Sequence, residues 1–179
     1  MRDPKDTSNA VDKFTALTHS RVKEFFNYDP KEGILRWKIK RKRGYPGKPA
    51  GSLQHTGYIQ AWVDGHPYQA HRLIWFWMTG KWPRYILDHK DRNKSNNRWD
   101  NLREATISQN ALNKISNKNK YGHKGIKYRI DRKSWVAFLE IGPKVHCFGS
   151  YKTKEEAIAA YRCNAPRICG EFTRFDENA

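Results

Sequence analysis

The hydrophobic and polar positions of the N-terminal part of the chain predict a series of short helices and strands. The run GILRWKIK alternates apolar and polar side chains, as a strand with one buried face does. The run HRLIWFWMTG is compact and apolar and ends at Gly80, which is typical of a buried helix. Asp64 and Gly65 separate two more alternating runs and favour a hairpin turn. The expected elements are helices over 18–30, 71–80 and 105–116, strands over 33–40 and 84–87, and a hairpin of 57–63 and 67–71.

The C-terminal part has a different pattern, in which strand-like runs over 124–130, 135–141 and 144–152 precede an amphipathic helix. Thr153 is the expected N-cap of this helix and Gly170 its stop. Pro166 has no backbone N–H, so we expect a kink or an early break near Asn164. The fold class is therefore α+β. The predicted parts are a polar segment 1–23, a first domain 24–115, a linker 116–122 and a second domain 123–179.

The charge of the chain indicates its partner. Lysine and arginine number 35 against 18 acidic residues, so the net charge is +17. Such a charge attracts polyanions, and nucleic acid is the first candidate because Lys and Arg contacts to phosphate release counterions. No acidic residue occurs from Gly33 to Val63, and this stretch is either a solvated face or a nucleic-acid contact surface. The aromatic residues interleaved with its bases favour contact, and Arg41 and Arg43 are the predicted DNA-binding residues.

Several classes of protein are disfavoured by the same composition. No apolar run approaches the roughly 20 residues that a bilayer span needs, so no membrane partner is expected. The N-terminus has no hydrophobic signal core, and we therefore expect a cytoplasmic protein. The cysteines Cys147, Cys163 and Cys169 form no CxxC pair, which favours reduced thiols over a zinc ribbon.

The segment LDHKDRNKSNNRWDNLREATISQN, Leu87–Asn110, contains five asparagines and carries the candidate chemistry. Asp88 and His89 follow one another at the end of a predicted strand, where a rigid backbone can aim both side chains. A carboxylate is a hard ligand that suits Mg²⁺ or Mn²⁺, and a neutral imidazole is a good general base near pH 7. Asn110 adds an amide oxygen as a second ligand. The alternative is a solvated loop with a structurally hydrogen-bonded histidine.

The order of these motifs resembles the HNH homing endonucleases of phages and introns. The runs AHRLIW, DH, NNR, DNLR and TISQN follow one another within a match that covers about residues 28–114. The resemblance implies a ββα-metal fold in which Asp88 binds the metal and His89 is the general base. It also implies that Asn101 ties the loop to the strand and orients the base. The resemblance also places Asn110 at the final motif position and implies that it binds the metal.

Neighbouring residues leave some roles open. Arg72 and Arg103 either touch phosphate or pair with acids of the loop. His71, which opens an apolar helix, is either a hydrogen-bonded structural residue or a contact to DNA. The structural role assigned to Asn101 is also open to three other amides of the loop, Asn93, Asn96 and Asn97.

The C-terminal runs KGI, SWVAFLEI, FGSY, TKEEAIAAY and GEF resemble the AP2-like DNA-binding domains found behind HNH nucleases. That family folds as a three-stranded antiparallel sheet with one helix, and its sheet face enters the major groove. The alternative is a small packing or oligomerisation module. The chain departs from the family where the sheet is usually more polar, at Phe138, Glu140, Val145 and Cys147. The predicted DNA contacts are Lys124, Lys127, Arg129 and Lys144.

Taken together, these patterns predict a metal-dependent, homing-type HNH endonuclease that nicks or cleaves duplex DNA with one Mg²⁺ or Mn²⁺ per site. The predicted partner is double-stranded DNA, and both a monomer and a homodimer remain open. A lone metal site favours cutting one strand per visit. One alternative is a non-catalytic DNA-binding regulator that retains both folds. Another is an RNA-binding or RNA-cleaving protein, because the many aromatic residues suit stacking on single strands.

Overall fold

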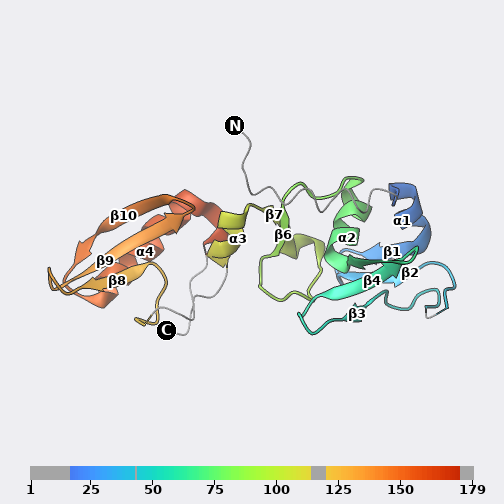
Figure 1. Cartoon of the computed structure of the whole chain (residues 1–179), viewed down its shortest axis with the longest axis horizontal. Helices are drawn as coiled ribbons and strands as arrows, with labels where there is room; N and C mark the ends of the chain where they lie inside the picture. The colour runs from blue at the N-terminus through green and yellow to red at the C-terminus, as the bar shows by residue number, and fades with distance from the viewer. Residues whose placement is uncertain (1–16, 43, 114–119, 174–179) are drawn as a thin grey trace. The chain divides into compact units, whose positions relative to one another are not determined.

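The structure, a computed structural model, describes residues 17–42, 44–113 and 120–173. The chain divides into two compact units, Met1–Glu104 and Ala105–Ala179 (Figure 1). Both units mix helices and strands, which confirms the α+β prediction. The predicted domain limits around 116–122 border on residues that are not described, so they stay predictions. Within the described residues no helix is long and apolar enough to cross a membrane.

The described residues of the first unit form three small sheets, and the pairs β1-β2, β3-β4 and β4-β5 are antiparallel. The sheets have the strand orders β1-β2, β3-β4-β5 and β6-β7. Its elements are α1 (His19–Phe25), β1 (Phe26–Asp29), β2 (Ile34–Trp37), β3 (Ser52–Leu53), β4 (Ile59–Val63), β5 (His66–Gln69), α2 (Ala70–Thr79), β6 (Ile86–His89), a 3₁₀ turn (Trp99–Asn101) and β7 (Leu102–Ala105).

The start of the first unit differs from the sequence prediction. Thr18 caps α1, and its side chain accepts a hydrogen bond from the Arg21 N–H at 3.2 Å. The helix ends at Phe25, however, so the predicted helix over 18–30 is wrong beyond that residue. Residues 26–29 instead pair with β2, because their side chains alternate between buried and exposed positions as a half-buried strand requires.

Helix α2 lies at the centre of the first unit and confirms the predicted apolar helix. It packs against α1, β4 and β5 (Figure 1). Leu73 and Ile74 are fully buried in the core that these elements share. The helix ends as predicted at Gly80, whose φ of 72° is a left-handed conformation that glycine adopts without steric cost. The hairpin predicted around Asp64 and Gly65 is also present, as β4 and β5.

The second unit holds one antiparallel sheet of strand order β10-β9-β8 with one long helix, α4, packed against it (Figure 1). A capping box between Thr153 and Glu156 starts α4, as the sequence predicts. The core is formed between the sheet and the helix and includes Ile126, Leu139 and Tyr161. The elements are α3 (Ile107–Asn113), β8 (Ile126–Arg129), β9 (Ser134–Ile141), β10 (Lys144–Tyr151), α4 (Lys154–Cys169) and a 3₁₀ turn (Gly170–Phe172).

Helix α4 does not break where proline was expected to break it. It runs from Lys154 to Cys169 with Pro166 inside, so the early break predicted near Asn164 is wrong, while the alternative of a kink stays a prediction. Pro166 lies in the last turn, where it removes the hydrogen bond that its own N–H would have donated and its ring crowds the preceding turn. Buried residues before it hold the helix on the sheet, and the Gly170 N–H closes the end by donating to the Pro166 carbonyl.

Candidate active site

Strand β6 carries Asp88 and His89, which are both buried at 6% and 4% exposure. Successive side chains of a strand point to opposite faces, so the two residues have different partners. Asp88 contacts Arg103 of the neighbouring strand β7, and His89 contacts Asn97 of the loop that joins the two strands. We call residues 90–101 of this connection the amide loop.

The carboxylate of Asp88 forms a buried ion pair. Its Oδ2 accepts hydrogen bonds from Arg103 Nε at 3.0 Å and from Arg103 Nη2 at 2.9 Å. Each side chain is only 7% exposed, so water screens the pair weakly. Of the two roles open to Arg103, pairing with an acid is therefore the one that the structure contains. The pair joins β6 to β7 and fixes the orientation of the carboxylate.

The imidazole of His89 is held by an amide. His89 Nε2 lies 3.0 Å from Oδ1 of Asn97, and the Asn97 side chain is buried. An amide oxygen only accepts hydrogen bonds, so in this contact Nε2 carries the proton. When the ring is neutral, this contact leaves its lone pair on Nδ1. The hydroxyl of Tyr28 in β1 donates to the Asn97 carbonyl at 2.7 Å and fixes the backbone of this residue in turn.

Asn101 closes the amide loop onto its own start. Its Nδ2 donates to Asp91 Oδ1 at 2.9 Å and to the Asn96 carbonyl at 2.7 Å, and its Oδ1 accepts from the Asp91 N–H at 3.0 Å. Its backbone carbonyl also accepts from the Lys90 N–H at 2.9 Å. Partial burial favours the neutral form of Asp91, but the hydrogen bonds from Asn96 and Asn101 outweigh it and lower the pKa of this carboxyl.

The turn between β1 and β2 packs against the amide loop and holds it in place through backbone contacts. The Trp99 N–H donates to the Pro30 carbonyl at 3.2 Å, and Arg98 Nε donates to the Lys31 carbonyl. Gly33 has a φ of 75°, and a Cβ at this position would lie 2.4 Å from the Arg98 nitrogen. Only glycine lets the two backbones approach this closely. The segment before the motif is therefore a structural part of the site.

His71 and Tyr58 pack beside His89. The His71 ring centroid lies 5.2 Å from that of His89 and 5.2 Å from that of Tyr58. Burial, together with the nearby His89 and Arg72, lowers the pKa of His71 to about 3, so the ring stays neutral at pH 7. Its buried Nδ1 has no hydrogen-bond partner within the described part of the chain. The prediction of a hydrogen-bonded structural histidine is not met at this atom.

The other predicted site residues belong to other elements of the structure or lie outside the described residues. Asn110 lies on α3, in the second unit. Arg41 lies in the first unit, and Arg43 is outside the described residues. In the second unit, Lys124 Nζ donates to the carbonyls of Ala111 and Leu112 at the end of α3.

The other predicted DNA-contacting residues of the second unit, Lys127, Arg129 and Lys144, lie on the strands of its sheet. Lys127 Nζ lies over the Phe138 ring at 4.9 Å, and Arg129 pairs with Asp131 at 2.7 Å. Lys144 opens β10 and is exposed. None of these contacts tests DNA binding, so these roles stay predictions.

A metal ion would find few protein ligands here. Among residues 17–42, 44–113 and 120–173 no group of three or more His, Cys, Asp and Glu side chains is arranged to hold one. Asp88 is the carboxylate that the resemblance assigns to the metal. Its Oδ2 accepts both bonds from Arg103, while a carboxylate has a second oxygen with lone pairs of its own. The donor chemistry of Asp88 fits a hard divalent ion, and most other ligands would be water and substrate oxygens.

Comparisons with known proteins agree with this geometry. Residues 68–112, which include α2, β6, the amide loop and β7, match the family model described as HNH endonuclease. The class that the site defines is therefore the HNH endonucleases. The chain is 34% identical over 180 residues to an uncharacterized HNH endonuclease of Acanthamoeba polyphaga mimivirus, with 94% of this chain and 91% of the relative covered. The chain belongs to the HNH endonuclease family, and it is a nuclease.

A second relative is shorter than this chain. Protein 3.8 of Escherichia phage T7 is 33% identical over 107 residues, which cover 59% of this chain and 88% of the relative. No solved structure matches the chain significantly. The family match ends at residue 112, so the resemblance of the second unit to AP2-like domains stays a prediction.

The structure adds contacts that the sequence did not identify. Asn97, rather than Asn101, is the amide that contacts His89. Asn93, Asn96 and Asn97 were all candidates, and their spacing alone does not separate them. The partner of Asp88 was also open, because Arg103 becomes its neighbour only through the pairing of β6 with β7.

Proposed function

We propose that this nuclease is a metal-dependent DNA endonuclease in which His89 is the general base. The observation that supports it best is the contact between His89 Nε2 and Asn97 Oδ1 at 3.0 Å. This contact selects the tautomer with the proton on Nε2 and the lone pair on Nδ1. Nδ1 then takes the proton from the water that attacks the phosphodiester, and a positioned general base contributes about 10²–10⁴ in rate.

The ring of His89 is held so that this proton transfer costs little reorganisation. Asn97 fixes one edge of the imidazole, and the rings of His71 and Tyr58 pack beside it. His71 is neutral at pH 7, since burial lowers its pKa to about 3, and it therefore adds no positive charge that would oppose the imidazolium of His89. Asp91 has a Coulombic interaction with His89, which helps to lower the pKa of the Asp91 carboxyl.

In the proposal, Asp88 is the protein carboxylate that holds Mg²⁺ or Mn²⁺. Arg103 orients it by binding Oδ2. Asn110, the second ligand, comes from the sequence resemblance. A divalent ion, when bound, supplies positive charge that offsets the charge developing on the phosphate and on the leaving 3′ oxygen. A site with so few protein ligands needs the nucleic acid to complete it, which makes metal binding and DNA binding cooperative.

Duplex DNA is the proposed substrate. The net charge of +17 favours a polyanion, and the second unit has the three strands and one helix that an AP2-like DNA-binding domain would require. The proposed products are a 5′ phosphate and a 3′ hydroxyl, and a monomer with one site would nick one strand per visit. The homing-type role, the cytoplasm of a bacterial host and the identity of the ion are parts of the same proposal.

The test is cleavage of supercoiled plasmid with Mg²⁺ or Mn²⁺ by the full chain and by His89→Ala. The expected result is relaxed plasmid that accumulates with the unchanged chain and disappears with the variant, while a gel mobility shift shows equal DNA binding by both. His66→Ala is the matched control, because His66 is exposed in β5 and should leave cleavage unchanged. Equal cleavage by the chain and His89→Ala would refute the assignment of the base.

A further inference from the structure

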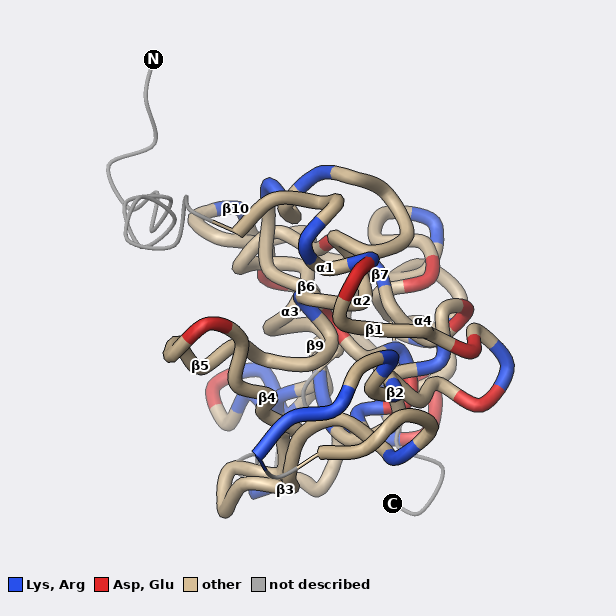
Figure 2. Tube along the Cα trace, turned by 90° about the vertical axis from the view of Figure 1, so that its right-hand side faces the viewer, with Lys and Arg blue, Asp and Glu red and all other residues tan. Residues whose placement is uncertain are grey.

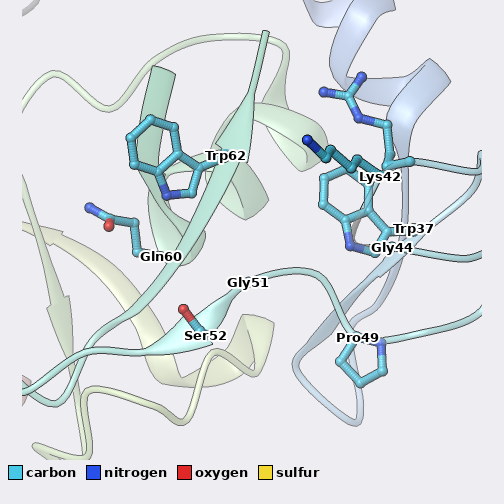
Figure 3. A pocket seen from close by; sticks show the side chains of 9 residues that line it. Trp37, Lys42, Gly44, Pro49, Gly51, Ser52, Gln60 and Trp62 are labelled. Carbon is cyan, nitrogen blue, oxygen red and sulfur yellow. The ribbon is translucent and has the colours of Figure 1, made fainter. Parts of the chain in front are cut away.

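The first unit contains a groove outside the candidate active site. It has a volume of about 590 Å³, which lies within the range of small-ligand sites. Strands β3 and β4 form one side, and the loop between β2 and β3 forms the other. Figure 3 shows Gln60 and Trp62 projecting from β4 on one side of the hollow and Trp37 and Lys42 across from them.

An exposed tryptophan borders the groove. The burial pattern of β4 places Ala61 and Val63 in the core, so Gln60 and Trp62 share the outer face of the strand. Trp62 is 58% exposed, although an indole of this size usually contributes to a core. Ser52 pairs with Gln60 in the sheet and adds a hydroxyl beside the amide. The face thus combines one open aromatic surface with polar groups that both donate and accept hydrogen bonds.

The opposite wall is positively charged. Between Gly33 and Val63 there are seven lysines and arginines and no acidic residue, and Figure 2 shows described members of this run in blue between β2 and β3. Lys42 is exposed at the groove. Arg41 is held in place over the rings of Phe25, at 4.5 Å, and Trp37, at 5.7 Å. It also lies 3.9 Å from Asp64, so its position is set before any ligand binds.

The backbone of the loop between β2 and β3 lies close to Trp37 and to strand β4. A Cβ on Gly44 would lie 2.6 Å from Trp37 Nε1, and a Cβ on Gly51 would lie 2.7 Å from the Gln60 carbonyl. Any larger residue at either position would push the wall away. The groove is therefore a packed feature of the first unit and is set by the same contacts that hold the β2–β3 loop.

We propose that this groove binds an unpaired base of the DNA substrate, which stacks on Trp62 while its phosphate lies against Lys42 and Arg41. A paired base has both faces covered by its neighbours, so an open indole face can stack only on a base that has left the helix. The polar groups of Gln60 and Ser52 reach the edge of that base. This inference rests on the proposed function for its choice of DNA, but it concerns binding and not cleavage.

The test measures binding to three labelled DNAs in the absence of divalent ions: a duplex with one bulged thymine, the same duplex fully paired, and the bulged strand alone. The full-length His89→Ala chain is used, so that cleavage does not enter the measurement. We expect this chain to bind the bulged duplex at least about tenfold more tightly than the paired duplex. The single strand should compete with the bulged duplex for the chain. Trp62→Ala should remove this preference and leave the affinity for the paired duplex unchanged, while Trp62→Phe should keep part of it.

Tyr85→Ala is the matched control, because Tyr85 is an exposed aromatic of the same unit that does not line the groove. Circular dichroism confirms that each variant is folded. Equal affinities for bulged and paired DNA, or a preference that survives Trp62→Ala, would overturn the inference. Tighter binding of an RNA strand of the same sequence would overturn the choice of DNA. A chain that cleaves DNA but binds bulged and paired duplexes equally would refute this inference and leave the proposed function standing. A chain that prefers the bulged duplex but cleaves no DNA would refute the proposed function and leave this inference standing.

Discussion

The amide loop of the first unit and the sheet of the second unit use polar residues in opposite ways. In the amide loop, the side chains of Asn96 and Asn101 both bind Asp91, and the side chain of Asn97 binds His89. On the sheet, Lys127 lies over the ring of Phe138 and Arg129 pairs with Asp131, and the two contacts are independent of one another. The first arrangement fixes a geometry in advance, as catalysis requires. The second leaves long side chains able to adapt to a charged surface.

Strands β9 and β10 of the second unit carry apolar side chains at positions where AP2-like domains are usually more polar. The pairing of β9 with β10 places Glu140 opposite Val145 and Phe138 opposite Cys147. Val145 is 62% exposed. Basic side chains that contact DNA from this sheet would therefore have to come mainly from β8, where Lys127 and Arg129 share one face.

The largest expected effect comes from breaking the buried pair of the first unit. Arg103→Met leaves the Asp88 carboxylate buried without its charged partner, and we expect a loss of ~3–5 kcal/mol in unfolding free energy. Urea unfolding followed by tryptophan fluorescence measures it, because six of the seven tryptophans precede residue 105. Arg129→Met, which breaks the exposed pair of the second unit, is the comparison and should change stability little. Equal losses would contradict the contrast.

The support beneath the amide loop is tested by Gly33→Ala. Both Gly33 and Gly65 have a left-handed backbone, with φ of 75° and 83°, but only at Gly33 would a Cβ collide, with Arg98. We expect Gly65→Ala to cost ~1–2 kcal/mol from backbone strain alone. Gly33→Ala should add ~1–3 kcal/mol for the displaced loop and should also slow cleavage. If the two variants unfold at the same urea concentration, the turn does not support the loop.

Asn97→Ala tests the contact to His89, the proposed general base. The variant removes the acceptor of His89 Nε2, and the imidazole is then free to change its tautomer and its orientation. We expect cleavage to fall about 10–100-fold, a part of what a general base contributes. Steady-state kinetics on plasmid DNA measures the change. Asn93→Ala is the control, since the Asn93 side chain binds only Ser95 in the described contacts and should leave the rate near that of the unchanged chain.

A pH dependence of stability is expected from His71. Its pKa is about 3 in the folded chain and 6.5 in the unfolded chain, so below pH 6.5 only the unfolded chain gains the proton. The stability that His71 contributes is thus fully present above pH 6.5 and is lost as the pH falls toward 3, with ~2 kcal/mol gone at pH 5. Urea unfolding at pH 7.5 and pH 5 should show a smaller difference for His71→Gln than for the unchanged chain. An equal difference would mean that His71 is not buried as a neutral ring.

The smallest effect is expected on the sheet of the second unit. Lys127→Ala should weaken binding to all DNA sequences alike and lower the salt slope by about one, as the loss of one phosphate contact does. Fluorescence anisotropy at several salt concentrations measures both quantities. A change that depends on the DNA sequence would instead assign Lys127 to base readout.

The sequence predicted the parts of the fold that depend on local pattern. Helix α2 with its Gly80 end, the β4-β5 hairpin and the capping box of α4 follow from periodicity, turn residues and caps, and all are present. The break near Asn164 failed because a proline in the last turn removes too little to stop a helix that is packed on a sheet. The helix over 18–30 failed because β1 exists only through its pairing with β2.

The candidate site was predictable in its residues and not in its contacts. The Asp88-His89 pair and the spacing to Asn101 are visible in the sequence. The amide that holds His89 is chosen by the path of the loop, which Tyr28 and Gly33 set from a distant part of the chain. No local pattern links these residues, so the sequence left Asn97 as one of several equal candidates.

The most direct test of the central claim, that the amide loop prepares His89 as a base, is the tautomer of its ring. Long-range ¹H–¹⁵N NMR of the histidine-labelled chain at pH 7.5 measures it, and comparison with His89→Gln identifies the signal. The account predicts that His89 has its proton on Nε2, and that Asn97→Ala shifts the population toward a mixture. A ring with its proton on Nδ1, or one that Asn97→Ala leaves unchanged, would contradict the account.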